Sequence, residues 1–384
     1  MESNIEATIK GWEDITNIKT ELLRGIYAHG FENPSSIQQK AILPILSKKD
    51  VIAQAQSGTG KTGAFTISAL QSLNMEKKAT QILIMVPTRE LCTQITSVIT
   101  TIGDFFNDLK IQMLVGGSSV DNDIRELRKN PQIIVGCPGR IHDMIRRNKL
   151  NAKDIDLLII DEADEMLSSG FKEQVYNIFQ FFKTDIQIAL FSATLPSDVQ
   201  SLADKFMREP LKILVKSEAL TLEGIKQYYI AVENDEVKYA TLKDLYATLS
   251  VGQSIIYCNS IRRVEDLAKA MKEDGFPVAY IHGKMTHEER KETFNSFKHG
   301  ASRVLISSNL TARGIDVQQV STVINFDVPR DVHSYLHRIG RSGRWGRKGM
   351  GINFVSKFDV RNLKEIETFY STQIDEMPSS VLEV

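Results

Sequence analysis

The chain has 384 residues, of which 42% are apolar and 25% are charged, and its formal net charge is −1. This length predicts two domains of ordinary size, and the composition is that of a globular protein. The near-zero net charge excludes a general attraction to nucleic acid, although a local arginine cluster would still bind it.

The apolar stretches and the cysteines argue against further classes of protein, namely membrane, secreted and disulfide-linked or zinc-binding proteins. No apolar run approaches the roughly 20 residues of a membrane span, and Glu2 and Glu6 interrupt the region where a signal peptide would be apolar. The three cysteines, Cys92, Cys137 and Cys258, are far apart, which favours a reducing compartment over a disulfide framework or a zinc site. We therefore expect a cytosolic or nuclear protein without a membrane anchor, with the cytoplasm as the predicted location.

Short β-branched apolar runs alternate with longer segments of helical period, which is typical of parallel sheets. The predicted strands are 51–53, 82–86, 111–115, 133–135, 157–160 and 188–190 in the first half, and 254–257, 278–281, 304–306, 322–324 and 352–354 in the second. The pattern predicts an α/β fold with two tandem parallel-sheet domains, 1–216 and 225–384, joined by a linker at 217–224. Because the polar motifs follow the strands, we expect them to line one crevice between the two sheets.

The first motif, Ala55 to Thr62, follows the strand at 51–53 and has the pattern of a phosphate-binding loop, with Ala55 in place of the usual first glycine. Main-chain N–H groups of such a loop surround phosphates, and the next helix directs its positive end at them. Lys61 is predicted to reach the β- and γ-phosphates, and Thr62 to bind Mg²⁺. A simple glycine-rich turn is the alternative, which Gly-Lys-Thr behind a strand disfavours.

The second motif, Asp161-Glu162-Ala163-Asp164, follows the apolar strand at 157–160. We expect Asp161 to hold Mg²⁺ and Glu162 to orient and deprotonate the attacking water. Carboxylates at a helix start also favour the helix dipole, which is the competing explanation. A buried strand leading into this tetrapeptide favours the first interpretation, so the sequence predicts ATP hydrolysis.

Asp161 to Asp164, together with Ser192-Ala193-Thr194 and the segment from His337 to Arg344, resembles the DEAD-box family of ATP-dependent RNA helicases. The resemblance covers essentially the whole chain, with about a dozen motifs in the family's order. It implies that both parallel-sheet domains are RecA-like.

The resemblance also implies the roles of further residues at the nucleotide. Gly30 to Gln38, which includes Phe31, corresponds to the adenine-reading segment, and Trp12 corresponds to the family's upstream aromatic residue. Asp316 would bind the ribose. Arg341 and Arg344 would act as arginine fingers from the second domain. The phosphate-loop residues implied are Ser57, Gly58, Thr59, Gly60, Lys61 and Thr62.

Four further residues are implied to connect the nucleotide to domain closure. Ser192 and Thr194 would link the γ-phosphate region through Asp164 to the domain interface, and His337 would bridge toward Asp164 in the closed state. ATP would then be hydrolysed only when the domains close, which makes the enzyme a switch.

The same resemblance assigns RNA contacts to Thr88, Arg89, Gly117, Pro138, Gly139, Arg140, Ser260, His287, Arg290 and Ser308. These residues offer hydroxyls, arginines and main-chain N–H groups and few aromatic rings, so they suit phosphates and sugars. We therefore expect single-stranded RNA to be bound without sequence preference. Cys137, His287 and Asn309 depart from the family's usual Thr, Gln and Asp, and we expect them to alter affinity without abolishing function.

Three functions remain open at this point. The first is an RNA-dependent ATPase that unwinds short duplexes, and the second is an ATP-dependent RNA clamp that holds a protein complex in place. The third, a DNA helicase, is disfavoured by the form of the motifs. The resemblance implies a monomer that works in translation initiation with a HEAT-repeat scaffold protein, which would supply specificity because no basic tail is present.

Overall fold

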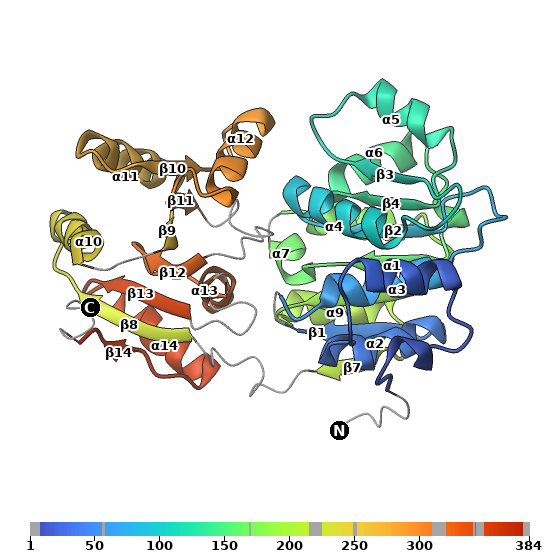
Figure 1. The fold of residues 1–384 in the computed structure, drawn as a ribbon, viewed down its shortest axis with the longest axis horizontal. Coiled ribbons are helices and arrows are strands. Elements are labelled where there is room, and N and C mark those ends of the chain that lie inside the picture. Colours follow the sequence, from blue (N-terminus) through green and yellow to red (C-terminus); the bar gives the residue numbers. More distant parts are fainter. Residues whose placement is uncertain are drawn as a thin grey trace. The chain divides into compact units, whose positions relative to one another are not determined.

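The computed structural model describes residues 8–55, 58–168, 170–214, 225–248, 252–308, 320–340, 342 and 349–378. The chain divides into two compact units, residues 1–216 and 217–384. The predicted linker at 217–224 lies outside the described residues. Figure 1 shows that each unit contains a sheet with helices packed on it.

The first unit has a seven-stranded parallel sheet in its described part, in the order β3-β4-β2-β5-β6-β1-β7. Its strands are β1 (Val51–Gln54), β2 (Ile82–Met85), β3 (Ile111–Leu114), β4 (Ile133–Gly136), β5 (Leu157–Ile160), β6 (Gln187–Ser192) and β7 (Leu211–Leu214). Its α-helices are α1 (Thr20–Ala28), α2 (Ser36–Leu46), α3 (Lys61–Ser72), α4 (Arg89–Ile102), α5 (Val120–Leu127), α6 (Pro138–Arg146), α7 (Ala163–Ser168), α8 (Lys172–Phe179) and α9 (Ser197–Phe206), with short 3₁₀ turns at Trp12–Asp14 and Ala152–Asp154.

Both faces of this sheet are buried. Ile82 and Ile84 of β2 contribute to one apolar cluster, with α1 to α4, whereas Leu83 and Met85 contribute to another on the opposite face. This alternation follows from the two-residue period of a strand. A strand covered on both faces reads as a continuous apolar run, which is why these strands are recognisable in the sequence.

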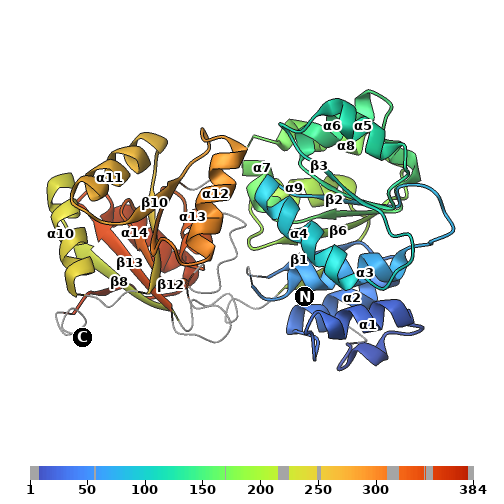
Figure 2. The ribbon, with the colours of Figure 1, turned by 45° about the horizontal axis from the view of Figure 1, so that its top comes forward.

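The second unit repeats the design, with strand order β10-β11-β9-β12-β13-β8-β14 in its described part. The strands are β8 (Ile225–Ala231), β9 (Gln253–Cys258), β10 (Val278–Ile281), β11 (Val304–Ser308), β12 (Val320–Asn325), β13 (Gly349–Val355) and β14 (Asp375–Glu376). The helices are α10 (Asp235–Thr248), α11 (Ile261–Glu273), α12 (His287–Lys298), α13 (Val332–Ile339) and α14 (Val360–Tyr370). α10 and α11 lie near each other in Figure 2 and share one apolar cluster with the sheet.

The structure confirms the predicted α/β fold and every predicted strand, and it adds β7, β8 and β14. These three lie at or next to the end of a sheet. Lys212 of β7 and Lys226 of β8 are exposed, and both residues of β14 are exposed acids. Partial exposure breaks the apolar run on which the strand predictions depended. Among the described residues, no helix combines the length and the apolar character needed to cross a membrane.

Candidate functional site

The phosphate-binding loop joins β1 to α3. Gly58 and Gly60 have φ values of 86° and 100°, a region that only glycine adopts without strain. A side chain at Gly60 would also lie 2.6 Å from Ser35 Oγ. α3 begins at Lys61, directly after Gly60, so its positive N-terminal end follows the turn. Ser57 lies outside the described residues.

Lys61 meets the acidic motif beside this loop. Its Nζ lies 3.3 Å from Glu162 Oε1, and both side chains are less than one tenth exposed. Burial lowers the pKa of Lys61, but the nearby carboxylates of Glu162, Asp161 and Asp164 reverse this effect and leave the pKa raised. Lys61 therefore stays protonated and can exchange its carboxylate partner for a phosphate.

Asp161 stands at the end of β5 and is buried. Burial raises the pKa of its carboxyl group, Lys61 opposes the shift, and Glu162 adds to it. A cation at this place would favour the ionised form. The hydroxyl of Thr62, in the first turn of α3, and the carboxylate of Asp161 are the hard oxygen donors that Mg²⁺ prefers, so the residues present fit the predicted ion.

Glu162 has a strained backbone, with φ at 51°, a value uncommon for residues other than glycine. Its main-chain N–H donates to Asp161 Oδ1 at 3.0 Å. Strain of this kind is held by the surrounding structure and clusters at functional sites. Here it accompanies the turn that directs the Glu162 carboxylate at Lys61.

Asp164 is hydrogen-bonded to the segment that follows β6. Thr194 donates to Asp164 Oδ2 through its hydroxyl at 2.6 Å and its main-chain N–H at 3.0 Å, and Asp164 N–H donates to Ser192 Oγ at 3.2 Å. All three side chains are buried. The structure thus places the acidic motif and the Ser-Ala-Thr motif in direct contact, as the linking role requires. His337, on α13 of the other unit, is also buried.

Of the three residues predicted to read adenine, Gln38 contacts the phosphate loop, whereas Trp12 is fully buried and packs against Phe31. Trp12 Nε1 donates to the main-chain oxygen of Phe31 at 2.9 Å, and the two rings stack with centroids 6.4 Å apart. Gln38 Nε2 donates to the Gly60 oxygen at 3.1 Å, and its Oε1 accepts from Ser35 N at 2.7 Å. An amide can form one further bond of each kind, which suits the edge of a base. Gln38 thus connects this segment physically to the loop.

The RNA contacts predicted in the first unit follow three adjacent strands, β2, β3 and β4. Thr88 caps α4, and a side chain at Gly117 would lie 2.4 Å from the Arg89 guanidinium, so Arg89 rests on that turn. Pro138 occupies the first turn of α6, and Gly139 is exposed. Arg140 forms a nearly buried ion pair with Asp123 and donates to the Ser118 oxygen at 2.9 Å. Sequence reasoning missed Asp123, which contacts Arg140 from α5.

The RNA contacts predicted in the second unit also follow adjacent strands. Ser260 caps α11 after β9, Ser308 ends β11, and Arg290 is in α12. The side chain of His287 and the residues Asn309, Asp316, Arg341 and Arg344 lie outside what the structure describes. The predictions for these five residues therefore stay predictions.

Sequence reasoning also missed a polar network in the second unit, formed by the buried residues Asp327 and Arg338 and the partly buried residues Asn259 and Arg263. Arg338 is 2% exposed. The motif that contains it predicts a cluster of arginines, but the pattern alone does not tell which arginine is buried and which can face a ligand.

Comparison with known families identifies two helicase domains in the chain. The DEAD/DEAH box helicase family matches residues 35–202, and the helicase conserved C-terminal domain matches residues 237–346. The ATP-dependent RNA helicase eIF4A of Neurospora crassa is 53% identical over 384 residues, which cover 100% of this chain and 96% of the relative. That of Aspergillus niger is 55% identical over 371 residues, with 97% and 93% covered.

Solved structures give the same result. S. cerevisiae Dbp5 bound to RNA and ADP BeF3 matches with a TM-score of 0.88 and 34% identity, covering 96% of this chain and 95% of that one. Mss116p bound to ssRNA and AMP-PNP matches with a TM-score of 0.87 and 27% identity, covering 99% and 82%. The two sheets are therefore RecA-like, as expected. The phosphate loop, the acidic motif and these matches together place the chain in the DEAD-box family of ATP-dependent RNA helicases.

Proposed function

We propose that this enzyme binds the backbone of single-stranded RNA without reading its sequence, and that ATP-driven closure of its two units separates short RNA duplexes. The observation that carries the proposal is the buried contact of Lys61 with Glu162 beside Asp161, because it places a phosphate-binding lysine and a candidate general base at one point. The relatives bound to RNA together with a nucleotide analogue support the pairing of these two ligands.

The residues divide the chemistry between them. Lys61 would leave Glu162 for the β- and γ-phosphates, which frees the Glu162 carboxylate to orient and deprotonate water. Thr62 and Asp161 would hold Mg²⁺, which neutralises phosphate charge when bound. Arg341 and Arg344 would stabilise the transition state from the second unit, so hydrolysis would require closure. Asp164, which accepts a hydrogen bond from Thr194, would couple the state of the nucleotide to the interface between the two domains.

The turns at the strand ends would bind the RNA. Hydroxyls and exposed main-chain N–H groups, as at Ser260 and Gly139, bond to phosphates and sugars, which carry no sequence information. The eIF4A names of the relatives support a role in translation initiation. We propose a cytoplasmic monomer whose specificity comes from a HEAT-repeat scaffold protein.

Measuring ATP turnover with and without single-stranded RNA, in the parent and in Glu162→Gln, tests the proposal. We expect RNA to stimulate the parent, and Glu162→Gln to lose at least about a hundredfold in turnover, as removal of a general base typically does. The variant should still bind RNA more tightly with ATP than without it. Stimulated turnover that survives this substitution would remove Glu162 from its role. A parent rate indifferent to RNA would refute the coupling itself.

A second experiment distinguishes an RNA clamp from an enzyme that unwinds duplexes. A clamp would remain on RNA after single-turnover hydrolysis when partner proteins are present, whereas an unwinding enzyme is released. Dissociation of labelled RNA, followed after a chase with unlabelled RNA, distinguishes the two.

A further inference from the structure

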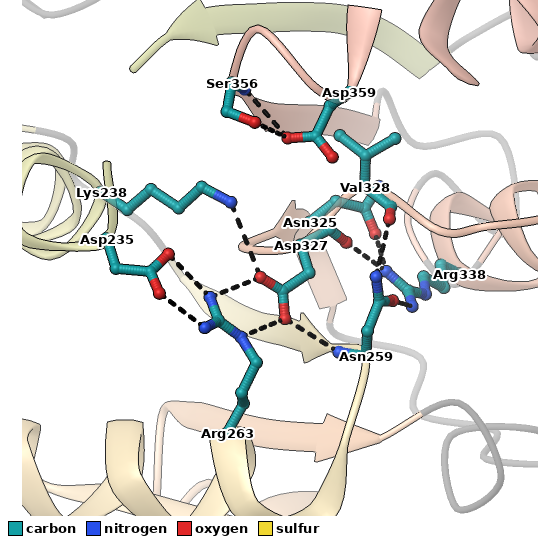
Figure 3. Close-up of polar contacts among 10 residues, drawn as sticks. All are labelled: Asp235, Lys238, Asn259, Arg263, Asn325, Asp327, Val328, Arg338, Ser356 and Asp359. Atoms are coloured by element: carbon teal, nitrogen blue, oxygen red, sulfur yellow. Dashed lines mark hydrogen bonds and ion pairs between the residues drawn. The ribbon is translucent and has the colours of Figure 1, made fainter. Parts of the chain in front are cut away.

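The guanidinium of Arg338 is buried at the carboxyl edge of the second sheet, where it joins several elements. Its Nη1 donates to Asn325 Oδ1 at 3.0 Å and to the Asp327 main-chain oxygen at 2.7 Å. Its Nη2 donates to Asn259 Oδ1 at 2.6 Å. Asn325 ends β12 and Asn259 follows β9, so a single side chain on α13 connects the ends of two neighbouring strands (Figure 3).

Asn259 is the second member of this network. Its Nδ2 donates to the Val328 oxygen at 2.9 Å, and its main-chain N–H donates to Asp327 Oδ2 at 3.0 Å. Both ends of its side chain are therefore engaged, one by Arg338 and the other by the chain after β12. The next residue is Ser260, whose hydroxyl caps α11 by accepting from Arg263 N at 3.3 Å. Any movement of Ser260 must act on Asn259.

Asp327 closes the network from the other side. Its carboxylate accepts two hydrogen bonds from Arg263, at 2.6 and 2.7 Å, and its Oδ1 lies 3.6 Å from Lys238 Nζ. Arg263 is in the first turn of α11 and also pairs with the exposed Asp235 (Figure 3). The start of α11 is thus fixed to the same residue whose main-chain oxygen holds Arg338.

Burying a guanidinium is costly unless its donors are satisfied, and burial lowers the pKa of Arg338. The planar fork of an arginine reaches several acceptors in fixed directions, which a lysine ammonium does not. Loss of one acceptor would therefore remove one of the contacts that hold the end of α13 in place. α13 ends at Ile339, two residues before Arg341.

We propose that Arg338 is a positioning residue, which with Asn259 ties the helix leading into Arg341 and Arg344 to the turn that carries Ser260. RNA held at Ser260 would then act, through Asn259 and Arg338, on the end of α13, which directly precedes the segment with the two predicted arginine fingers. The inference rests on the proposed function and adds a route, within the second unit, by which bound RNA controls hydrolysis. Because Arg338 is buried, we assign it this positioning role and no contact with nucleotide or RNA.

The test compares the parent with Arg338→Lys, Asn259→Ala and the double variant. The main readout is the factor by which the nonhydrolysable analogue AMP-PNP tightens binding of single-stranded RNA. We expect both single variants to lose about tenfold or more of this factor, while RNA affinity without nucleotide changes less than about threefold. The double variant should lose no more of this factor than the poorer single variant, because both substitutions break the same connection between Arg338 and Asn259.

Two controls separate positioning from stability. Asp235→Asn removes the outer partner of Arg263 and leaves the Arg338 contacts intact, so it should keep the parent's factor. Ile256→Val deletes one buried methylene from β9, and it shows what a loss of melting temperature alone does to the readout.

The outcomes are distinguishable. If the parent shows the tightening and both tie variants keep it, this inference is overturned and the proposed function stands. Equal loss in Ile256→Val, at a matched melting temperature, would likewise overturn it. If AMP-PNP does not tighten RNA binding by the parent, the proposed function and the inference fall together.

Discussion

Gly63 lies on α3 where the helix passes Phe31 and Gln38, which are predicted to read adenine. A methyl group there would lie 2.5 Å from Gln38 Nε2 and 2.9 Å from a ring carbon of Phe31. The contact shows why this position of the helix is a glycine although alanine is the better helix former. It also makes Gly63 a sensitive probe of the adenine site.

We predict that Gly63→Ala raises the KM for ATP by about tenfold, because Gln38 and Phe31 must move out of place. The turnover at saturating ATP should change less than about threefold, since Lys61 and Glu162 are untouched. Titration of ATP in the RNA-stimulated assay measures both. Gly252→Ala, where a methyl group meets only an ordinary contact at 3.5 Å, is the matched control. An unchanged KM would argue against adenine binding here.

A second residue-scale prediction concerns the hydroxyl of Thr194. Thr194→Val keeps the shape but removes the 2.6 Å hydrogen bond to Asp164, a bond to a buried charged group worth about 1.5–3 kcal/mol. We expect strand separation to fall at least about tenfold, while RNA-stimulated ATP turnover stays within about threefold. Thr194→Ser, which keeps the hydroxyl, should behave like the parent. Equal loss of both activities would place Thr194 in the hydrolysis step.

At the scale of elements, α1 and α4 pack closely at Gly25. A methyl group there would lie 1.8 Å from the main-chain oxygen of Ile102, and a main-chain atom cannot rotate away. We predict that Gly25→Ala lowers the free energy of unfolding by about 1–3 kcal/mol, as overpacking of a core does. Urea denaturation of the full chain measures the change. Gly11→Ala meets only the flexible Glu13 side chain and should be nearly neutral, and equal effects would contradict the packing argument.

The elements also show which parts of the fold a sequence reveals. β2 and β5 are buried on both faces and read as apolar runs, so their positions could be predicted. β8 mixes Lys226 and Gln227 with apolar residues, and β14 has only two exposed acids, so neither gives a periodic signal. Tertiary pairing decides their conformation, which local pattern cannot reveal.

The candidate site, too, has features that the sequence predicts and features that it does not. The proximity of Lys61 to Asp161 and Glu162 was predictable, because each motif directly follows a recognisable strand. The Arg140 ion pair with Asp123 and the Arg338 tie were not, because each joins residues distant in sequence. Burial favours a structural role for Arg338, and only the fold shows which arginine of the motif is buried.

At the scale of the whole molecule, the predicted site residues fall on two units. The first unit holds the phosphate loop and the acidic motif, and the second holds Ser260, Ser308 and the helix that leads to the two arginines. If neither unit suffices alone, ATP turnover and RNA binding must rise and fall together. The enzyme would then work as a switch, with nucleotide and RNA each favouring the closed state.

Strand separation of RNA duplexes of graded length, with one labelled strand, tests this account most directly. With ATP and Mg²⁺, we predict rapid separation of a duplex shorter than one helical turn and little separation of one longer than two turns. ADP should not support it, and chelation of Mg²⁺ should abolish it. Separation that is equally fast with ADP, or ATP turnover stimulated by RNA without any separation of the short duplex, would contradict the account.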